Sequence, residues 1–319
     1  MSRMIWIAWE KHRRTIEWSK ALDATLFIFD FDTMYIFRLI KSSLKTLITI
    51  NRHRPNVLIV QNPSMILAAL ACMLKNIFRY KLVIDRHSNF RLDNKRSVSM
   101  KIFHRLSNYT LGNADITIVT NDDAKRIVEE KKGRSIILPD KIPHLSKKTD
   151  LSLKGKFNIV NISSFARDEP YEEVIRAASL LGDDIIIYIT GNFNKIGPEI
   201  RENLPKNVIL TGFLKEEEFI DLLFNSDIIM DFTTAELTLV CGGYEAMATE
   251  KPFITSYTNT LKKYFQNYVY YTNNRAVDIA SSILHILSNL EESKKNMIIL
   301  KKEKIEEWNF QFQCLKNLL

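Results

Sequence analysis

The residues best suited to chemistry lie in the run Cys241-Gly-Gly-Tyr-Glu-Ala-Met-Ala-Thr249. Glycines at the start of a helix let backbone amides approach a phosphate closely, and the helix dipole favours an anion there. Glu245, about one helical turn further on, is placed to accept hydrogen bonds from ribose hydroxyls. The run indicates a nucleotide site at Cys241, Gly242, Gly243 and Glu245. Taken alone, it is more typical of a tight packing turn followed by a surface glutamate.

A second group of polar residues follows the first predicted strand. Glu10 and His12 are candidates for the general base that deprotonates an acceptor hydroxyl, because carboxylate and imidazole are common proton acceptors in catalysis. Arg13 and Arg14 are candidates for contact with an acceptor phosphate. The alternative for both arginines is the solvated start of an amphipathic helix.

Short β-branched runs alternate with amphipathic stretches and position these residues. The predicted strands are 4–9, 25–31, 56–61, 81–85, 115–120, 135–138, 157–162, 184–190, 208–212, 227–232, 252–256 and 268–271. The predicted helices are 12–22, 33–52, 64–78, 97–112, 122–132, 170–181, 216–225, 242–249, 275–290 and 291–319. Several strands are apolar at consecutive positions, such as Val57-Leu-Ile-Val60, as expected where helices cover both faces of a parallel sheet.

This alternation predicts an α/β protein with two doubly wound, Rossmann-like domains. The segment from Pro139 to Gly155 lacks periodicity and carries turn formers and charges, so we interpret it as the linker between domains 1–147 and 148–319. Because ligands bind at the carboxyl ends of parallel strands, we expect the site where the two domains face each other.

The second half also resembles a known family. The segment 231–256 is similar to the donor-binding signature of GT-B glycosyltransferases, in particular the family 4-like group of bacterial polysaccharide and lipopolysaccharide enzymes. In that group a glutamate in Glu-Ala-Met-Ala, followed by a Pro-led strand, holds the ribose; here these are Glu245–Ala248 and Pro252. Three further stretches occur in the expected order: Ser163-Ser-Phe-Ala-Arg-Asp-Glu-Pro170, Tyr188-Ile-Thr-Gly191 and Asn207-Val-Ile-Leu-Thr-Gly-Phe-Leu214. The resemblance covers residues 157–275, and over 1–150 it rests mainly on the strand–helix pattern.

The resemblance implies a GT-B fold with an acceptor-binding domain, a nucleotide-sugar-binding domain and a terminal helix that packs back on the first domain. It implies a catalytic His87 that points at the donor sugar. Donor-binding roles extend to these loop residues: Arg167, Gly191, Gly212, Phe213, Thr233 and Thr234. Arg167 would neutralise the diphosphate leaving group, so no metal and no cofactor besides the nucleotide-sugar co-substrate is expected. Read alone, Phe213 is typical of a core residue and Arg167 of a solvated one.

One position departs from the family pattern. Two glutamates with seven residues between them are usual, yet the position eight before Glu245 is Leu237. The nearest acid is Glu236. Either Glu236 contacts the transferred sugar from a reshaped loop, or the contact is lost and the site is not catalytic.

Composition restricts the partners. The three cysteines lack metal-type spacing, which favours a reducing cytosol over a disulfide scaffold or a zinc site. A net charge of +8 fits a phosphorylated substrate or an anionic membrane. Nucleic acid is not expected, because no recognition helix, zinc finger or aromatic sheet signature occurs. No apolar run is long enough to span a bilayer, so we expect a cytoplasmic or peripheral protein.

Two predicted helices carry basic residues beside apolar ones. The first holds Arg38, Lys41, Lys45 and Arg52 with Phe37, Leu39, Ile40 and Leu44, and the terminal helix holds Lys294, Lys295, Lys301, Lys302 and Lys304. Such a surface favours contact with the anionic inner face of the cytoplasmic membrane, where a lipid-linked acceptor resides. Ordinary solvated helix faces are the alternative.

Together these patterns predict transfer of a sugar from a UDP- or GDP-sugar to a glycan or lipid-linked glycan in surface polysaccharide, lipopolysaccharide or capsule biosynthesis. Two rivals are a nucleotide-sugar epimerase of the same fold and a non-catalytic GT-B subunit that binds another glycosyltransferase.

Overall fold

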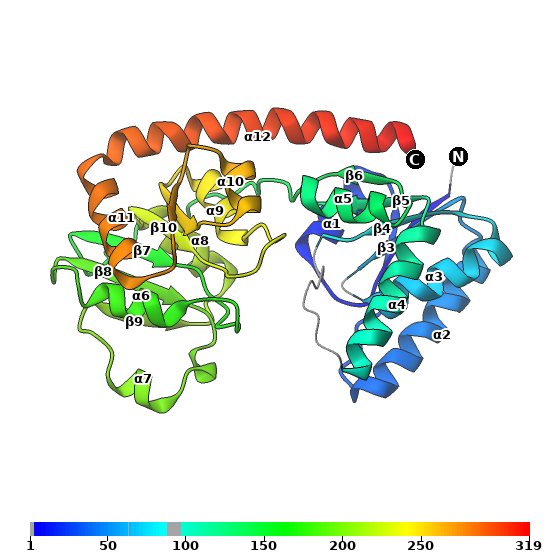
Figure 1. Ribbon diagram of the computed structural model, residues 1–319, viewed down its shortest axis with the longest axis horizontal. Helices are drawn as coiled ribbons and strands as arrows, with labels where there is room; N and C mark the ends of the chain where they lie inside the picture. Colours follow the sequence, from blue (N-terminus) through cyan, green and yellow to red (C-terminus); the bar gives the residue numbers. More distant parts are fainter. Residues whose placement is uncertain (1–2, 63, 88–96) are drawn as a thin grey trace. The chain divides into compact units, whose positions relative to one another are not determined.

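The computed structural model describes residues 3–62, 64–87 and 97–319, and these residues form two compact units (Figure 1). Unit 1 contains the chain up to Asp140 together with Trp308–Leu319, and unit 2 contains Lys141–Glu307. Each unit holds one six-stranded sheet in which every pairing is parallel. No helix among the described residues is long and apolar enough to cross a membrane.

Unit 1 alternates strand and helix throughout. Its elements are β1 (Met4–Ala8), α1 (Arg13–Ala21), β2 (Thr25–Ile28), α2 (Tyr35–His53), β3 (Val57–Gln61), α3 (Met65–Phe78), β4 (Lys81–Asp85), α4 (Val98–Asn113), β5 (Ile116–Val119), α5 (Asp122–Glu130) and β6 (Ser135–Ile137). The strand order is β2-β1-β3-β4-β5-β6, so the connections change direction between β1 and β3. In a doubly wound sheet this switch point is where ligands bind.

The sheet of unit 1 is apolar on both faces. Ile5 and Ile7 of β1 point to the face covered by α2 and α3, whereas Trp6 between them points to the opposite face with Trp18 of α1. Successive side chains of a strand alternate between faces, so a strand buried on both sides is apolar throughout.

An aromatic cluster fixes the end of the terminal helix α12 (Leu290–Leu318) on this second face. Trp308 stacks on Phe312 with ring centroids 4.6 Å apart, and Trp18 meets both rings edge-on at 6.1 and 6.4 Å. The Nε1–H of Trp308 donates to the carbonyl of Pro139 at 3.1 Å. The last part of the terminal helix, Trp308–Leu319, therefore belongs to unit 1. Trp6 and Trp9 also belong to unit 1, so all four tryptophans of the chain lie in this unit.

Unit 2 repeats the plan. Its elements are β7 (Phe157–Asn161), α6 (Tyr171–Ala178), β8 (Ile185–Thr190), the 3₁₀ turn η1 (Phe193–Lys195), α7 (Pro198–Glu202), β9 (Val208–Gly212), α8 (Glu216–Asn225), β10 (Ile228–Asp231), α9 (Cys241–Thr249), β11 (Phe253–Ser256), α10 (Asn259–Phe265), β12 (Tyr270–Thr272), α11 (Ala276–Ser288) and the first part of α12. The order β12-β11-β10-β7-β8-β9 places the switch point between β7 and β10. Helices α6 and α11 cover one face, and α8, α9, α10 and α12 cover the other.

The predicted two-domain, parallel-sheet architecture is confirmed, and every predicted strand and helix is present with ends shifted by a few residues. Three elements were not predicted: η1, α7 and α10. They are three, five and seven residues long. Elements this short do not complete the two turns over which a helical apolar period can be recognised.

Candidate functional site

A cavity of about 300 Å³ lies at the switch point of unit 2. It is bordered by the loop after β7, the loop after β10 and the start of α9, through Ile162, Ser163, Ser164, Asp168, Glu169, Asp231, Phe232, Thr233, Thr238, Leu239, Val240 and Cys241. Of the predicted donor-binding residues, the structure brings Thr233 and Cys241 into this wall.

Two carboxylates hold the loop after β7 in place. Glu169 accepts hydrogen bonds from the hydroxyl of Ser163 at 2.6 Å and from both the amide and the hydroxyl of Ser164 at 2.8 and 2.6 Å. Asp168 accepts from the hydroxyl of Thr233 at 2.8 Å, which ties this loop to the loop after β10. The backbone carbonyl of Asp168 also accepts the amide of Thr234 at 2.7 Å. The wall is therefore preorganised by its own hydrogen bonds.

A third carboxyl group, Asp231, ends β10 and is buried. Its Oδ2 accepts the amide of Gly242 at 2.8 Å. Burial raises the pKa of Asp231 well above its ordinary value, and the nearby charges of Glu169, Glu245 and Asp168 raise it further against the opposing hydrogen bond from Gly242. Asp231 thus keeps its proton to a higher pH than an exposed aspartate does.

The double glycine packs closely against the rest of unit 2. The amide of Gly242 is bonded to Asp231, and the amide of Gly243 donates to the carbonyl of Val240 at 3.3 Å. A Cβ atom on Gly242 would lie 2.6 Å from Cβ of Asp231, and one on Gly243 would lie 2.2 Å from Cζ of Phe265. Both amides have partners within unit 2 and neither glycine borders the described cavity, so phosphate binding by these amides stays a prediction.

Glu245 lies one turn into α9 and is 6% exposed. It is close enough to Asp231 for its charge to raise the pKa of that carboxyl. Glu245 is not among the described residues that border the cavity. Its contact with a ribose stays a prediction.

The loop that departs from the family pattern supports a neighbouring helix. Leu237 is buried with φ at 65°, a conformation that costs a side chain of this size about 1 kcal/mol or more, and its amide donates to the hydroxyl of Thr260 at 3.2 Å. The exposed Glu236 accepts the amide of Asn259 at 3.3 Å, at the start of α10. This carboxylate is not among the described residues that border the cavity, and its replacement of the usual sugar-contacting glutamate stays a prediction.

The other predicted donor residues lie along the same edge but outside the cavity wall. Gly191 was expected to leave room for a nucleotide; instead the carbonyl oxygen of Ser163 fills that space, 2.1 Å from where a Cβ atom would be. Gly212 has φ at 75° and pairs with Gly191. Phe213 is 91% exposed and therefore not part of the core, and Arg167 is an exposed cation of the loop after β7.

In unit 1, Arg14 is structural. It is 3% exposed and donates to Asp85 at 2.9 Å, to Asp140 at 2.6 Å and to the carbonyl of Leu138 at 2.9 Å, while its guanidinium lies 3.6 Å from the ring centroid of Trp18. The prediction that Arg14 contacts an acceptor is corrected, because these groups occupy its donors. Arg13 is exposed at the start of α1.

Two histidines meet at the carboxyl edge of this sheet. The ring centroids of His12 and His87 are 5.2 Å apart, and Nδ1 of His87 lies 3.4 Å from Oδ2 of Asp85. Burial, followed by the charge of His87, lowers the pKa of His12 below its ordinary value. Burial acts to raise the pKa of Asp85, but Arg14 and His87 outweigh it and hold that pKa below the usual range. An imidazole beside a permanent carboxylate is a suitable proton acceptor.

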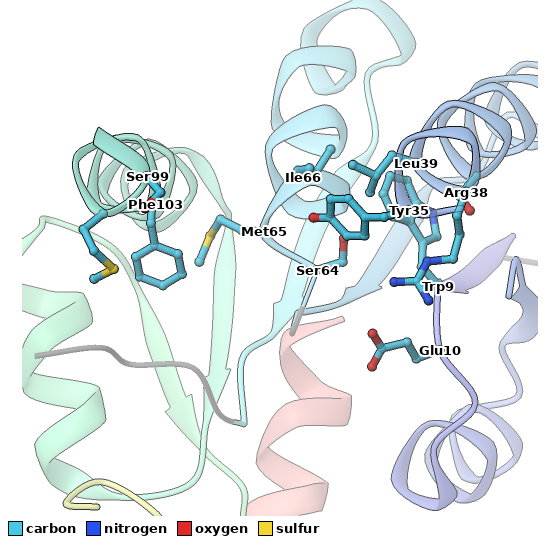
Figure 2. Close-up of a pocket in the computed structure, with 12 residues that line it drawn as sticks. Trp9, Glu10, Tyr35, Arg38, Leu39, Ser64, Met65, Ile66, Ser99 and Phe103 are labelled. Atoms are coloured by element: carbon cyan, nitrogen blue, oxygen red, sulfur yellow. The ribbon is translucent and has the colours of Figure 1, made fainter. Parts of the chain in front are cut away.

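Unit 1 also has a cavity of about 300 Å³ at its own switch point (Figure 2). The predicted base Glu10 lines it and points toward the guanidinium of Arg38, which extends from α2 (Figure 2). The remaining wall combines three serines with seven apolar or aromatic residues: Ser42, Ser64, Ser99, Trp9, Tyr35, Leu39, Met65, Ile66, Met100 and Phe103. His12 and His87 do not line this cavity among the described residues.

Arg38 and Ser64 were not predicted as site residues. One signal was present: Ser64 and Ser97 cap helices α3 and α4, whose first turns lie at the carboxyl edge of the sheet. Helix starts at that edge are where a doubly wound domain receives its ligands.

The comparisons with known proteins concern the fold. No family model and no curated protein sequence matches the chain. A sucrose-phosphate synthase from Thermosynechococcus elongatus aligns with a TM-score of 0.80 and 14% identity over 100% of this chain and 98% of that one. Alr3699/HepE from Anabaena, in complex with UDP and glucose, aligns at 0.75 with 12% identity over 98% and 92% of the two chains. A glycosyltransferase from Rickettsia africae aligns at 0.64 with 14% identity over 97% and 90%. The fold of this chain is therefore that of GT-B proteins.

Proposed function

From a GT-B fold with a cavity at the switch point of each unit, we propose that the chain is a glycosyltransferase. It takes a sugar from a UDP- or GDP-sugar bound by unit 2 and transfers it to a glycan or lipid-linked glycan bound by unit 1, in surface polysaccharide assembly. The pair of cavities carries the proposal. A neighbour of this fold supports it, since HepE has been crystallised with UDP-glucose.

On the donor side, the wall of the cavity offers hydrogen-bond acceptors rather than cations. Asp168, Glu169 and Asp231 are suited to the hydroxyl groups of a sugar. In this proposal, Glu245 accepts hydrogen bonds from the ribose hydroxyls of the nucleotide. The diphosphate needs a positive partner, and the exposed Arg167 on the adjoining loop is our candidate.

On the acceptor side, Glu10 is the proposed general base. Arg38 lines the same cavity beside it, so an acceptor phosphate or glycan hydroxyl on Arg38 would bring a neighbouring hydroxyl to Glu10. The apolar and aromatic part of the wall suits a lipid-linked acceptor. His87, held by Asp85, is the second candidate base.

Nucleotide binding is the direct test, and Cys241 provides a local reporter. This exposed thiol borders the cavity of unit 2. We expect calorimetry to give a dissociation constant for UDP or GDP below the millimolar range, and bound nucleotide to slow alkylation of Cys241. Cys314, which lies in unit 1, is the internal control and should be labelled at the same rate.

Replacement of Glu245 by Gln should weaken nucleotide binding about tenfold, since one charge-assisted hydrogen bond to a ribose is worth about 1.5 kcal/mol. Thr249→Ser, one turn further along α9, is the matched control and should bind as the wild type does. If neither UDP nor GDP binds below the millimolar range, the proposal fails. Full affinity in Glu245→Gln removes the ribose assignment alone.

One observation favours a second function. Leu237 is buried where the resembling enzymes carry a sugar-contacting glutamate, and Glu236 caps α10. A GT-B subunit that binds nucleotide without turnover and supports a partner glycosyltransferase would tolerate this loss. Tight nucleotide binding without release of UDP from UDP-sugars, with or without added acceptor, would favour this alternative.

A further inference from the structure

A large apolar surface is exposed on unit 1 over three adjacent helices, α2, α3 and α4 (Figure 1). We call it the α2–α4 face. Of 24 large hydrophobic side chains exposed among the described residues, it carries eight on α2 and its N-cap, three on α3 and three on α4. They are Met34, Tyr35, Ile36, Phe37, Ile40, Leu44, Leu47, Ile48, Ile66, Met73, Ile77, Val98, Ile102 and Tyr109. A concentration of this kind marks an interaction surface.

A row of cations borders the apolar side chains on α2. Arg38, Lys41, Lys45 and Arg52 follow one another at intervals of three, four and seven residues, so they share one side of the helix. Ile40 and Leu44 lie on the adjoining side at the same helical spacing and are 52% and 55% exposed. An exposed apolar stripe beside a row of Lys and Arg is the signature of a helix that lies in a bilayer interface.

The face contains no acidic residue. The three helices have the sequences YIFRLIKSSLKTLITINRH, MILAALACMLKNIF and VSMKIFHRLSNYTLGN, which hold seven Lys and Arg and no Asp or Glu. At the average composition of the chain, 49 residues would carry about six acids. Of these seven side chains, Lys75 pairs with Asp115, and the whole chain has a net charge of +8.

Three of the four cations in the row on α2 have no acidic partner in an ion pair among the described residues. In the described part of the chain, no carboxylate forms an ion pair with Lys41, Lys45 or Arg52. The terminal helix differs, because Lys294, Lys301 and Lys304 each pair with a glutamate. Lys295 and Lys302 of the terminal helix are exposed as well, but that helix carries several glutamates, whereas α2 holds no acidic residue beside its apolar stripe.

We infer that the α2–α4 face docks on an anionic lipid bilayer, with the apolar side chains in the acyl boundary and the cations at the headgroups. Charge decides between occupants: a second copy of the same face would bring Lys41, Lys45 and Arg52 against cations of the same kind, whereas anionic headgroups attract them. Nucleic acid would match the charge but leave the apolar side chains in water.

The cavity of unit 1 adjoins this face. Tyr35 and Ile66 belong both to the face and to the cavity wall, so a molecule held in the bilayer by an apolar tail reaches Arg38 and Glu10 without leaving the membrane surface. The membrane inference stands on the face alone and does not require turnover, which keeps its failure separate from that of the proposed function.

Vesicle flotation tests the inference with the full chain. At low salt we expect at least tenfold more protein bound to vesicles containing phosphatidylglycerol than to pure phosphatidylcholine, and loss of most of this binding in about 0.5 M salt. The triple variant Ile40→Ser, Leu44→Ser, Ile48→Ser should lose at least tenfold in partitioning. So should the double variant Lys41→Glu, Lys45→Glu.

Matched controls use equally exposed positions elsewhere. Leu180→Ser, Leu284→Ser, Ile298→Ser replaces side chains that are 54%, 48% and 48% exposed, and Lys295→Glu, Lys302→Glu replaces exposed lysines of α12; both should bind vesicles as the wild type does. Equal binding to neutral and anionic vesicles overturns the inference, and so does unchanged binding of the α2 variants. A dimer in light scattering that the Ile40, Leu44 and Ile48 triple variant dissociates would assign the face to self-association instead.

Discussion

At the scale of single residues, the environment of each titratable group decides what it contributes. Arg14 and Asp85 are both buried and each satisfies the charge of the other, so neither is available to an acceptor. His87 gains a fixed carboxylate neighbour from this pair. The ion pair between Arg14 and Asp85 thus positions His87, a candidate base. Charged residues at the same edge of the sheet can therefore have different functions.

The lowered pKa of His12 predicts a pH dependence of stability. Its pKa is 6.5 when unfolded and lower when folded, so the unfolded state binds more protons between these two values. The free energy of unfolding of unit 1 should therefore fall as the pH drops below about 6.5, by about 1.4 kcal/mol for each unit of the difference in pKa. Tryptophan fluorescence during urea unfolding at pH 7 and pH 5 measures this, because all four tryptophans lie in unit 1.

His12→Gln should make that pH dependence shallower. His285→Gln, in unit 2, serves as the control and should leave the fluorescence-detected transition unchanged at both pH values. A variant without His12 that loses as much stability between pH 7 and pH 5 as the wild type would show that other groups account for the dependence.

At the scale of elements, α9 can pack closely against its neighbours because its first turn contains two glycines, which have no side chains. Gly243→Ala would push a methyl group against the buried ring of Phe265, so we expect unit 2 to lose about 1–3 kcal/mol of stability. Faster amide hydrogen exchange in α9, with an unchanged tryptophan-detected transition, is the expected measurement.

Gly197 offers the matched control for this substitution. Nothing lies within 4 Å of where its Cβ atom would be, so Gly197→Ala should cost under about 1 kcal/mol. Adding Phe265→Leu to Gly243→Ala should give a loss smaller than the sum of the two single losses, since the two positions share one contact. Additive losses would contradict the described packing of α9.

At the scale of the whole molecule, α12 belongs to both units. Trp308→Ala removes the ring that stacks on Phe312 and contacts Trp18, together with the hydrogen bond to Pro139. We expect unit 1 to lose about 3–5 kcal/mol, measured from the fluorescence of the three remaining tryptophans. Phe310→Ala, two residues away and 72% exposed, should change stability by less than about 0.5 kcal/mol. Equal effects of the two variants would contradict the packing of α12 on unit 1.

The sequence predicts the architecture well because its signals are local. Strands such as Val57–Gln61 and Ile185–Thr190 are continuous apolar, β-branched runs, and each is buried in the sheet. The site is harder to predict because its contacts are not local. Gly242 meets Asp231 and Gly243 meets Phe265, 11 and 22 residues away, and no spacing rule distinguishes such packing from a phosphate-binding turn.

Only part of the α2–α4 face could be predicted from the sequence. The basic and apolar pattern of α2 is periodic and can be recognised, whereas the contributions of Ile77 and Val98 depend on how α3 and α4 pack beside it. The cavity of unit 1 combines side chains from three helices with the loop after β1, so its existence follows only from the tertiary arrangement.

The aromatic cluster of unit 1 has a consequence for biosynthesis. Trp18 leaves the ribosome early, yet Trp308 and Phe312 are made only after the whole segment Lys141–Glu307. At typical translation speeds this delay is on the order of ten seconds or more. The first unit to be synthesised is therefore the last to be completed, and the part of its second sheet face that Trp308, Phe312 and Leu315 cover stays in contact with water until α12 is made.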